Sequence, residues 1–442
     1  MKLNKFLWVY FVSRRFANVD MSGRSALASR LASLGICFGV MTLIAVLSVM
    51  NGFQMSFIDA IMEVSSYHVR IENVRSDLTE EFENYCGNFL KSSKHKSGFR
   101  VKTLIPFYES QSFIVGNASG GAAALIRALP ENVFELDEGF EREVNVIRGE
   151  FDLSSSGDKD LIVLGSSLAS KLGVRIGNTV NLLALSGGND VEMLSSKRIF
   201  TVAGIFHTGY AGINSGYAFI GLNAGEKYFG SQPKKIYGIK LFDQFQSESF
   251  INEIKSRFLQ VKAESWKSYN RSFFGALRVE KNMLMLFVFL IFVVVCINIF
   301  NSMKRMVYER RNEISILSAL GGKNRMIQAV FIFRGFLTGV TGAFCGLALG
   351  LLLSVQTGRI FKILSFFTYG IQYFFTMLFS PENAAYLHEN PMYLVYAGLP
   401  ARIFMHEVLI ITVFGIFSSL AASWLASMGI LKLKAAEVLR DE

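Results

Sequence analysis

Four apolar runs are each long enough to cross the hydrocarbon core of a membrane, which takes about 20 residues of helix. They occupy residues 31–50, 283–300, 335–355 and 408–430. Because lipid offers the backbone no hydrogen-bonding partners, an isolated run of this kind must fold as a helix. The sequence therefore predicts four transmembrane helices.

Two further apolar stretches are interpreted differently. Residues 360–379 are rich in aromatic side chains but are interrupted by Lys362, Gly370 and Gln372. We predict an interfacial helix there rather than a fifth span. Residues 6–12 are also apolar, but Arg14 and Arg15 follow them instead of a small-residue cleavage site. We expect this stretch to be an amphipathic helix on the membrane surface, not a signal peptide.

Residues 52–277, between the first two runs, are polar enough to form a domain in water. Alternating stretches such as 67–71 and 198–202 predict strands, and 166–172 predicts a short helix that Gly173 ends. The expected fold is an α-helical membrane protein with four transmembrane helices and a large α+β periplasmic domain between the first and second. Its parts are residues 1–51, 52–277 and 278–442.

The charge distribution predicts the orientation. The net charge is +10, yet residues 52–277 hold 24 basic and 25 acidic side chains. The excess of basic residues lies in segments 1–30, 303–334 and 432–440. By the positive-inside rule these three segments face the cytoplasm, so both termini are cytoplasmic and the chain is multi-pass. The positive charge thus reports membrane orientation, and no nucleic-acid partner is expected.

Catalytic and metal-binding motifs are incomplete. His406-Glu407 begins like a zinc-protease helix, but Ile410 stands where the second histidine ligand belongs. Gly321-Gly322-Lys323 lacks the remaining residues of a phosphate-binding loop and is better explained as a helix C-terminus. We therefore predict no catalytic residues, no metal site and no enzymatic activity in this chain.

Glycines four residues apart mark the first and third apolar runs. Such spacing lets another helix approach closely. The sequence leaves open whether that helix belongs to the same subunit or to a second one. The candidate helix-packing residues are Gly35, Gly39, Gly335, Gly339, Gly342, Gly346 and Gly350.

Residues 303–325 join the second and third runs, and Ile314, Leu317 and Leu320 share one face of a short helix there. Such a helix either transmits force from a bound partner or rests on the lipid headgroups. The segment resembles the coupling segment of MacB/FtsX-like ABC transporter permeases, Glu-Arg-Arg-x-Glu-Ile-x-x-Leu-x-Ala-Leu-Gly. The matching residues are Glu309, Arg310, Arg311, Glu313, Ile314, Leu317, Ala319, Leu320 and Gly321.

The exit of the first run, Leu47-Ser48-Val49-Met50-Asn51-Gly52-Phe53, is similar to the narrower family of lipoprotein-releasing (Lol-type) permeases. The chain departs from that family at residues 425–429, where a Pro-Ala-x-x-Ala turn is usual. The resemblance implies a permease subunit that extracts lipoproteins from the bacterial inner membrane and hands them to a periplasmic carrier. It also implies a second permease subunit, identical or homologous, together with contacts to membrane lipids. ATP and Mg²⁺ would be bound by a separate cytoplasmic ABC ATPase dimer, and this chain would hold no cofactor.

The resemblance also suggests two binding regions. The lipid-anchored cargo would lie near Val49, Met50, Phe53, Leu284 and Phe287, which ordinary helix packing explains equally well. A loop would capture the carrier, unless it is a plain hairpin loop. Its residues are Ser186, Gly187, Gly188, Asn189, Asp190, Val191, Glu192, Met193, Leu194, Ser195, Ser196 and Lys197.

Two other functions stay open on the sequence. An FtsX-like membrane subunit would transmit ATPase motion to a periplasmic cell-wall hydrolase and transport nothing. A membrane-anchored scaffold would need no coupling segment at all.

Overall fold

The computed structural model describes residues 8–13, 24–91, 99–116, 120–156, 159–184, 198–229, 234–379, 401–428 and 430. The chain divides into two compact units. One, the helical unit, comprises Met1–Phe53 and Leu277–Glu442. The other, the α+β unit, comprises Gln54–Ala276.

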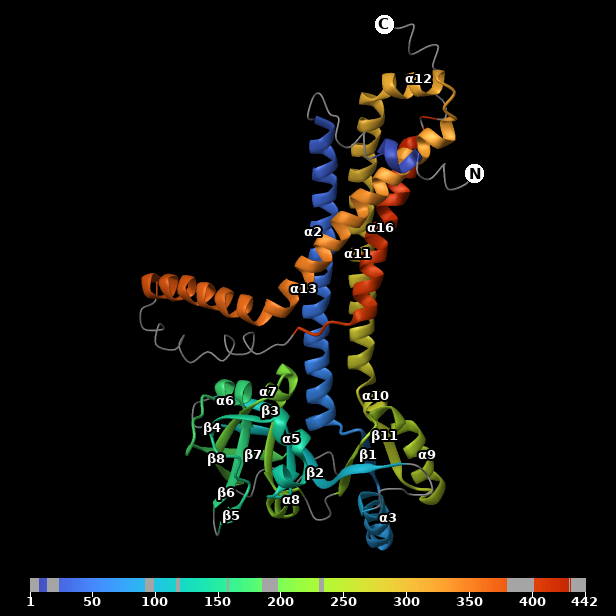
Figure 1. The fold of residues 1–442 in the computed structure, drawn as a ribbon. Helices are drawn as coiled ribbons and strands as arrows, with labels where there is room; N and C mark the ends of the chain where they lie inside the picture. The colour runs from blue at the N-terminus through green and yellow to red at the C-terminus, as the bar shows by residue number, and fades with distance from the viewer. Residues whose placement is uncertain are drawn as a thin grey trace. The chain divides into compact units, whose positions relative to one another are not determined.

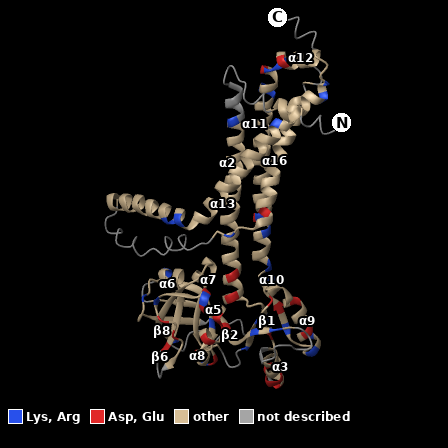
Figure 2. Cartoon of the chain, in the orientation of Figure 1, with Lys and Arg blue, Asp and Glu red and all other residues tan. Residues whose placement is uncertain are grey.

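In the described residues, five helices account for most of the helical unit, and Figure 1 shows how they are arranged. They are α2 (Arg24–Ala60), α11 (Arg271–Glu309), α12 (Arg311–Ala319), α13 (Asn324–Phe379) and α16 (Met405–Ser427). All except α12 are long and apolar enough to cross a membrane. They contain no proline, so nothing removes a backbone donor from their interiors. Lys, Arg, Asp and Glu are sparse along these four helices and gather around α12 (Figure 2). The four predicted spans are therefore confirmed.

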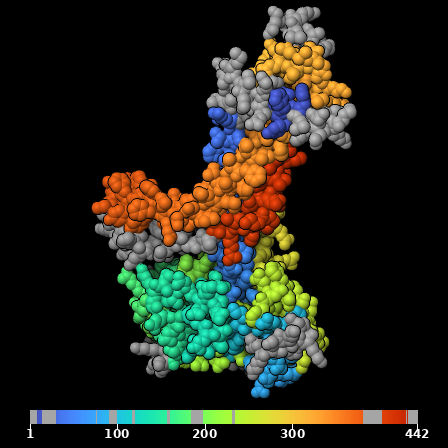
Figure 3. Space-filling view, in the orientation of Figure 1, coloured from blue at the N-terminus to red at the C-terminus, as the bar shows by residue number. Residues whose placement is uncertain are grey.

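The apolar stretch 360–379 is not a separate helix, because it forms the C-terminal part of α13. This part of α13 leaves the bundle that α2, α11 and α16 form, and it stands away from that bundle in space (Figures 1 and 3). At the other end of the chain, residues 8–13 are helical, and the rest of the predicted N-terminal helix lies outside the described residues.

Helix α13 crosses α2 at three of the predicted glycines. A Cβ on Gly342 would lie 2.6 Å from the Ser33 carbonyl oxygen, and one on Gly346 would lie 2.6 Å from that of Cys37. At Gly350 the nearest atom, from Ile44, would be 3.0 Å away. These close approaches are possible only because no side chain separates the two backbones.

The same helix meets α16 one turn earlier, at Gly335 and Gly339. A Cβ on either glycine would overlap serines of α16, Ser423 in the first case and Ser419 in the second. The Ser419 hydroxyl donates a hydrogen bond to the Gly335 carbonyl oxygen at 2.6 Å. Five of the seven predicted packing glycines therefore lie at crossings within one chain.

Within its described residues, the α+β unit is built on an 11-stranded sheet. Nine strands follow the order β11-β1-β10-β2-β3-β9-β6-β8-β4, while β5 pairs with β6, and β7 pairs with both β2 and β8. The strands are β1 (Val69–Glu72), β2 (Val101–Val115), β3 (Gly121–Leu129), β4 (Asn145–Gly149), β5 (Ser155–Ser156), β6 (Lys159–Gly165), β7 (Thr179–Ala184), β8 (Ile199–His207), β9 (Tyr217–Gly221), β10 (Ile236–Leu241) and β11 (Lys262–Ser265). The long strand β2 pairs with β10 over its first half and with β3 and β7 over its second. It therefore joins the two halves of the sheet.

Short helices cover this sheet. They are η1 (Ile61–Ser65), η2 (Ser76–Leu78), α3 (Thr79–Lys91), α4 (Val133–Leu136), α5 (Glu138–Glu143), α6 (Ser166–Leu172), α7 (Ala211–Gly216), α8 (Leu222–Tyr228), η3 (Gln244–Gln246), α9 (Ser247–Arg257) and α10 (Trp266–Tyr269). Helix α6 ends as predicted, because Gly173 adopts the left-handed conformation (φ 65°) and donates to the carbonyls of its last turn. The predicted strands at 67–71 and 198–202 appear as β1 and β8. The α+β fold class is thus confirmed.

Buried charges hold η1, which continues directly from α2, onto the sheet. Arg127 of β3 has no exposed side-chain surface and donates to the carbonyl oxygens of Val64 and Ser65. It also pairs with Glu109 of β2, whose other carboxylate oxygen lies 2.5 Å from Arg70 of β1. Burial alone would raise the pKa of Glu109, but the charges of the two arginines lower it below its usual value. The carboxylate is therefore ionised.

A second ion pair joins η1 to another strand. Lys240 of β10 lies 2.5 Å from Glu63 of η1 and 2.6 Å from Asp137, which caps α5. Only 2% of the Lys240 side chain is exposed. A buried charge of this kind is tolerated only when it is paired and hydrogen-bonded.

We expect Arg127→Met to lower the free energy of unfolding of the α+β unit by about 3–5 kcal/mol. The substitution removes one of the two arginines that pair with the buried Glu109, and it leaves the carbonyls of Val64 and Ser65 without their donor. The control is Arg75→Met, whose ion pair with Asp77 is more than half exposed and contributes about 0–1 kcal/mol. Urea unfolding of the full chain, followed by hydrogen exchange in β2 and β3, measures the difference. Equal losses of unfolding free energy in the two variants would contradict a stabilising role for the buried Arg127 ion pair.

We expect the α+β unit to lose stability as the pH falls below about 6.5, the usual histidine pKa. Burial lowers the pKa of His68, whose Nδ1 accepts a hydrogen bond from the Leu241 N–H at 3.0 Å. The unfolded chain therefore takes up this proton at a higher pH than the folded one, which favours unfolding in acid. His68→Asn keeps an acceptor and removes the titration. The drop in unfolding free energy between pH 7.5 and 5.5 should be smaller in this variant than in the wild type.

Candidate functional site

Helix α12 is fixed to the ends of α11 and α13 by its inner face. Ile314 is 2% exposed and belongs to the apolar cluster that contains Met303 and Met306 of α11 and Ile327 of α13. Leu317 packs against the same cluster. A displacement of α12 would therefore be resisted by contacts with both long helices at once.

Charged residues fasten the joint between α11 and α12. Arg310 is buried and its guanidinium lies 3.0 Å from the carboxylate of Glu313. One turn earlier in α11, Arg305 lies 3.2 Å from Glu309. The Arg311 guanidinium stands 5.2 Å from the centre of the Tyr308 ring. The Glu-Arg-Arg-x-Glu run thus forms short-range pairs that stabilise the junction between α11 and α12.

Large apolar side chains are exposed on α12 and next to both of its ends. Leu320 is 81% exposed, Ile316 51% and Tyr308, just before the helix, 69%. The helix stops at Ala319, and Gly321 follows with a left-handed φ of 92°, as the sequence predicts for this glycine pair. Exposed large apolar side chains on a helix otherwise rich in charge are typical of a protein contact.

The nine predicted coupling residues therefore divide into two groups. Ile314, Leu317 and Arg310 face inward or are buried, and they hold the segment in place. An exposed group comprises Arg311, Glu313, Ala319, Leu320 and Gly321. Glu309 also belongs to the exposed group and pairs with Arg305. Sequence reasoning missed Ile316 and Tyr308, although the presence of two bulky apolar residues between charges was a usable signal.

A polar cluster ties three helices together at the other end of the helical unit. The Asn51 amide of α2 donates to Glu407 of α16 at 2.6 Å, and Lys281 of α11 lies 3.2 Å from the same carboxylate. Asn51 is buried, and only 14% of the Glu407 side chain is exposed. Sequence reasoning considered Glu407 only as a metal-site fragment. A lone acid at the start of an apolar run was the signal that it needs partners within the bundle.

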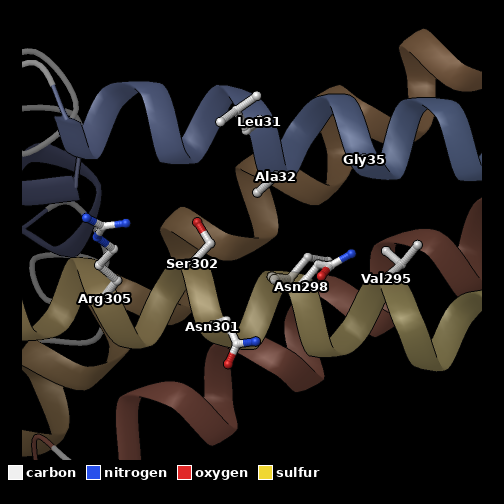
Figure 4. Close-up of a pocket in the computed structure, with 9 residues that line it drawn as sticks. Leu31, Ala32, Gly35, Val295, Asn298, Asn301, Ser302 and Arg305 are labelled. Carbon is white, nitrogen blue, oxygen red and sulfur yellow. The ribbon is translucent and has the colours of Figure 1, made fainter.

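A half-open groove of about 420 Å³ lies between α2 and α11 (Figure 4). Its α2 wall is small and apolar, with Leu31, Ala32 and Gly35, and a Cβ on Gly35 would meet nothing within 4 Å. Its α11 wall is partly polar, with residues Val295, Asn298, Ile299, Asn301, Ser302 and Arg305. One turn further along α2, a Cβ on Gly39 would lie 3.4 Å from a methyl group of Val295, so α2 and α11 are closer there. A wall of each kind suits an amphiphile better than a fully polar ligand.

The predicted cargo residues do not line this groove. Val49, Met50 and Phe53 are half-buried on α2, Leu284 is half-buried on α11, and Phe287 is 59% exposed. They lie toward the ends of α2 and α11 where Asn51 and Lys281 meet Glu407. Their role in cargo binding stays a prediction.

The predicted carrier loop, residues 186–197, lies outside the described residues. The strands that flank it are described. Strands β7 and β8 pair antiparallel, with Thr179 opposite Thr201, and the Leu182 N–H donates to the Arg198 carbonyl at 3.0 Å. The loop therefore connects the two strands of a hairpin.

The described ranges bring no three His, Cys, Asp or Glu side chains together where a metal ion would be held. Ser166 and His207 do meet, at 3.0 Å between Oγ and Nδ1, but Ser166 is only 5% exposed. A buried hydroxyl has no room for a substrate, so this pair joins α6 to β8 rather than forming a nucleophile.

Comparison with known proteins places the two parts of the chain. Residues 29–257 match the family model of the MacB-like periplasmic core domain, and residues 285–435 match the FtsX-like permease C-terminal model. The lipoprotein-releasing system transmembrane protein LolC of Haemophilus influenzae is 33% identical over 350 residues, which are 77% of this chain and 82% of that protein. The transmembrane protein LolE of the same organism is 25% identical, over 97% of this chain and 98% of that protein.

A solved structure, the periplasmic region of MacB from Actinobacillus actinomycetemcomitans, aligns with 48% of this chain and 97% of that one, at 14% identity and a TM-score of 0.29. The family is decided by the sequence matches. The chain belongs to the LolC/LolE family of lipoprotein-releasing system transmembrane proteins, and it combines a match to the MacB-like periplasmic core domain with a match to the FtsX-like permease C-terminal domain.

Proposed function

We propose that this chain is the membrane subunit of an ABC transporter that extracts lipoproteins from the bacterial inner membrane and passes them to a periplasmic carrier. Family membership supports the substrate class, since the relatives are named as parts of a lipoprotein-releasing system. Both termini and α12 face the cytoplasm in this proposal, in line with the basic segments that surround them. A second permease subunit, identical or homologous, completes the membrane part.

The exposed apolar residues of α12 and its C-terminal end support the proposal that a separate cytoplasmic ATPase dimer binds there and supplies the energy of ATP hydrolysis. Leu320 and Ile316 offer an apolar contact, and Arg311 and Glu313 beside them offer charges of both signs. A central apolar anchor surrounded by charged residues is the usual composition of a protein–protein hot spot. ATP and Mg²⁺ would be bound by the ATPase and not by this chain.

The path of the motion follows from how α12 is anchored. Closure of the ATPase dimer pushes on α12, and the apolar cluster that Ile314 shares with residues of α11 and α13 passes the displacement to both helices. Helix α11 continues without a break from Arg271 to Glu309. It is therefore the direct covalent route from the proposed ATPase contact toward the α+β unit.

Cargo and carrier are assigned to the opposite side of the membrane. Acyl chains of the lipoprotein would lie near Val49, Met50, Phe53, Leu284 and Phe287, between the first and second spans of two permease subunits. Each buried CH₂ contributes about 0.8 kcal/mol to such binding. The carrier would be captured by the hairpin loop 186–197, through its backbone edge or its side chains.

We expect ATP-dependent release of a lipoprotein from proteoliposomes into a soluble carrier when this chain, its permease partner and the ATPase are reconstituted together. Leu320→Ser removes the exposed apolar side chain that directly follows α12. Loss of a hot-spot contact of about 2 kcal/mol would weaken ATPase binding about 30-fold, and release would fall with it. Glu313→Lys, which breaks the pair with Arg310, should lower release as well.

The matched control is Leu259→Ser, because Leu259 is 89% exposed but lies on the α+β unit. It should leave both ATPase binding and release unchanged. If ATP-dependent release is absent with every component present, the transport proposal fails. Co-purification of a cell-wall hydrolase in place of release would support the FtsX-like alternative instead.

We expect deletion of residues 187–196 to abolish carrier binding while leaving ATPase binding intact, because these residues form the proposed carrier loop and join two strands that pair with each other, β7 and β8. Deletion of residues 117–119, in the hairpin loop between β2 and β3, serves as the control. Surface plasmon resonance with immobilised carrier measures both. Unchanged binding after the first deletion would remove the loop from the proposal.

A further inference from the structure

Helix α13 is much longer than one membrane crossing requires. Its 56 residues extend for about 84 Å at 1.5 Å per residue, whereas the hydrocarbon core is about 30 Å thick. Its last buried residues are Ser354 and Thr357, at the end of the predicted third span. The remaining helix, residues 359–379, is here called the arm. The arm extends beyond the third span, so it must be accommodated outside the helical bundle.

The arm is apolar and exposed. Phe366, Phe374 and Phe379 are 74%, 65% and 75% exposed, and residues 359–379 include no buried side chain. The arm stands away from α2, α11 and α16 (Figures 1 and 3). This much exposed aromatic surface is not stable in water and requires a partner or a membrane.

The sequence of the arm is amphipathic in a way that favours a membrane surface. At 3.6 residues per turn, the polar residues of the arm fall within an arc of about 180°, one half of the helix circumference. They are Arg359, Lys362, Ser365, Thr368, Tyr369, Gln372, Tyr373 and Thr376. The opposite side carries only large apolar residues, namely Ile360, Phe367, Ile371, Phe374 and Leu378, all at least 42% exposed. A span would be apolar all round, whereas a helix lying in the interface has one face of each kind.

The distribution of charged residues in the arm also favours a membrane surface. Residues 359–379 contain no Asp or Glu, and their two basic residues, Arg359 and Lys362, both lie at the end that joins the span. Lipid headgroups carry phosphates that pair with basic side chains, and long basic side chains reach them readily from the membrane boundary. The absence of acidic residues removes the repulsion that an anionic headgroup layer would exert.

We propose that the arm is a lipid-binding element that lies in the boundary between headgroups and acyl chains, with Phe367 and Ile371 turned toward the acyl chains. Helices of this kind bury their apolar face about 5–10 Å into that boundary. The polar arc, centred on Ser365 and Thr376, faces the headgroups and water. The arm therefore widens the contact of this subunit with the bilayer surface beyond its four spans, independently of what the protein transports.

The test uses spin labels on the full chain in phospholipid nanodiscs. The four native cysteines are replaced by alanine, and single cysteines are introduced as Phe367→Cys and Ile371→Cys on the apolar side. Ser365→Cys and Thr376→Cys are the matched controls on the polar side. Thermal unfolding confirms that each variant keeps its fold, and collision with oxygen or with a water-soluble nickel chelate is measured for each label.

We expect labels at 367 and 371 to collide with oxygen more than with nickel, and labels at 365 and 376 to show the reverse ratio. Three results would overturn the proposal. Low collision with both probes at 367 and 371 means that protein, such as a second subunit, covers this side. High collision with nickel there means that the arm is in water. An equal oxygen preference on both sides means that the arm spans the bilayer.

Discussion

Close packing between backbones holds the helical unit together, because lipid gives apolar helices no hydrophobic reason to associate. Helix α13 supplies this packing on two sides. Gly335 and Gly339 admit the serines of α16, and the glycines from Gly342 onward admit the backbone of α2.

Polar contacts then decide which ends of the helices stay together. Glu407 joins α2, α11 and α16 at one end through Asn51 and Lys281. Arg310 and Glu313 fasten α11 to α12 at the other. In the α+β unit, Arg127 and Lys240 bind η1 through the carbonyls of Val64 and Ser65 and the carboxylate of Glu63. Each buried charge here has a partner, as the cost of burying an unpaired one requires.

Much of this architecture could be predicted from the sequence. The four spans, the α+β domain, the end of α6 at Gly173 and the stop of α12 before Gly321 all follow from hydropathy or local backbone preference. The positions of the coupling residues also followed from a motif. Their division into an inner anchor and an outer contact face did not, because burial of Ile314 and exposure of Leu320 depend on where α11 and α13 lie.

Hydropathy specifies the number and length of the spans, because transfer of a side chain into lipid is a property of that residue alone. Contacts between elements cannot be predicted in this way. The sheet order, the partners of Arg127 and the helix that each glycine meets all join residues far apart in the chain. Such contacts exist only after folding has brought several elements to one place, so no local pattern encodes them. The glycine spacing thus predicts that another helix crosses closely, while only the folded chain shows that the helices are α2 and α16.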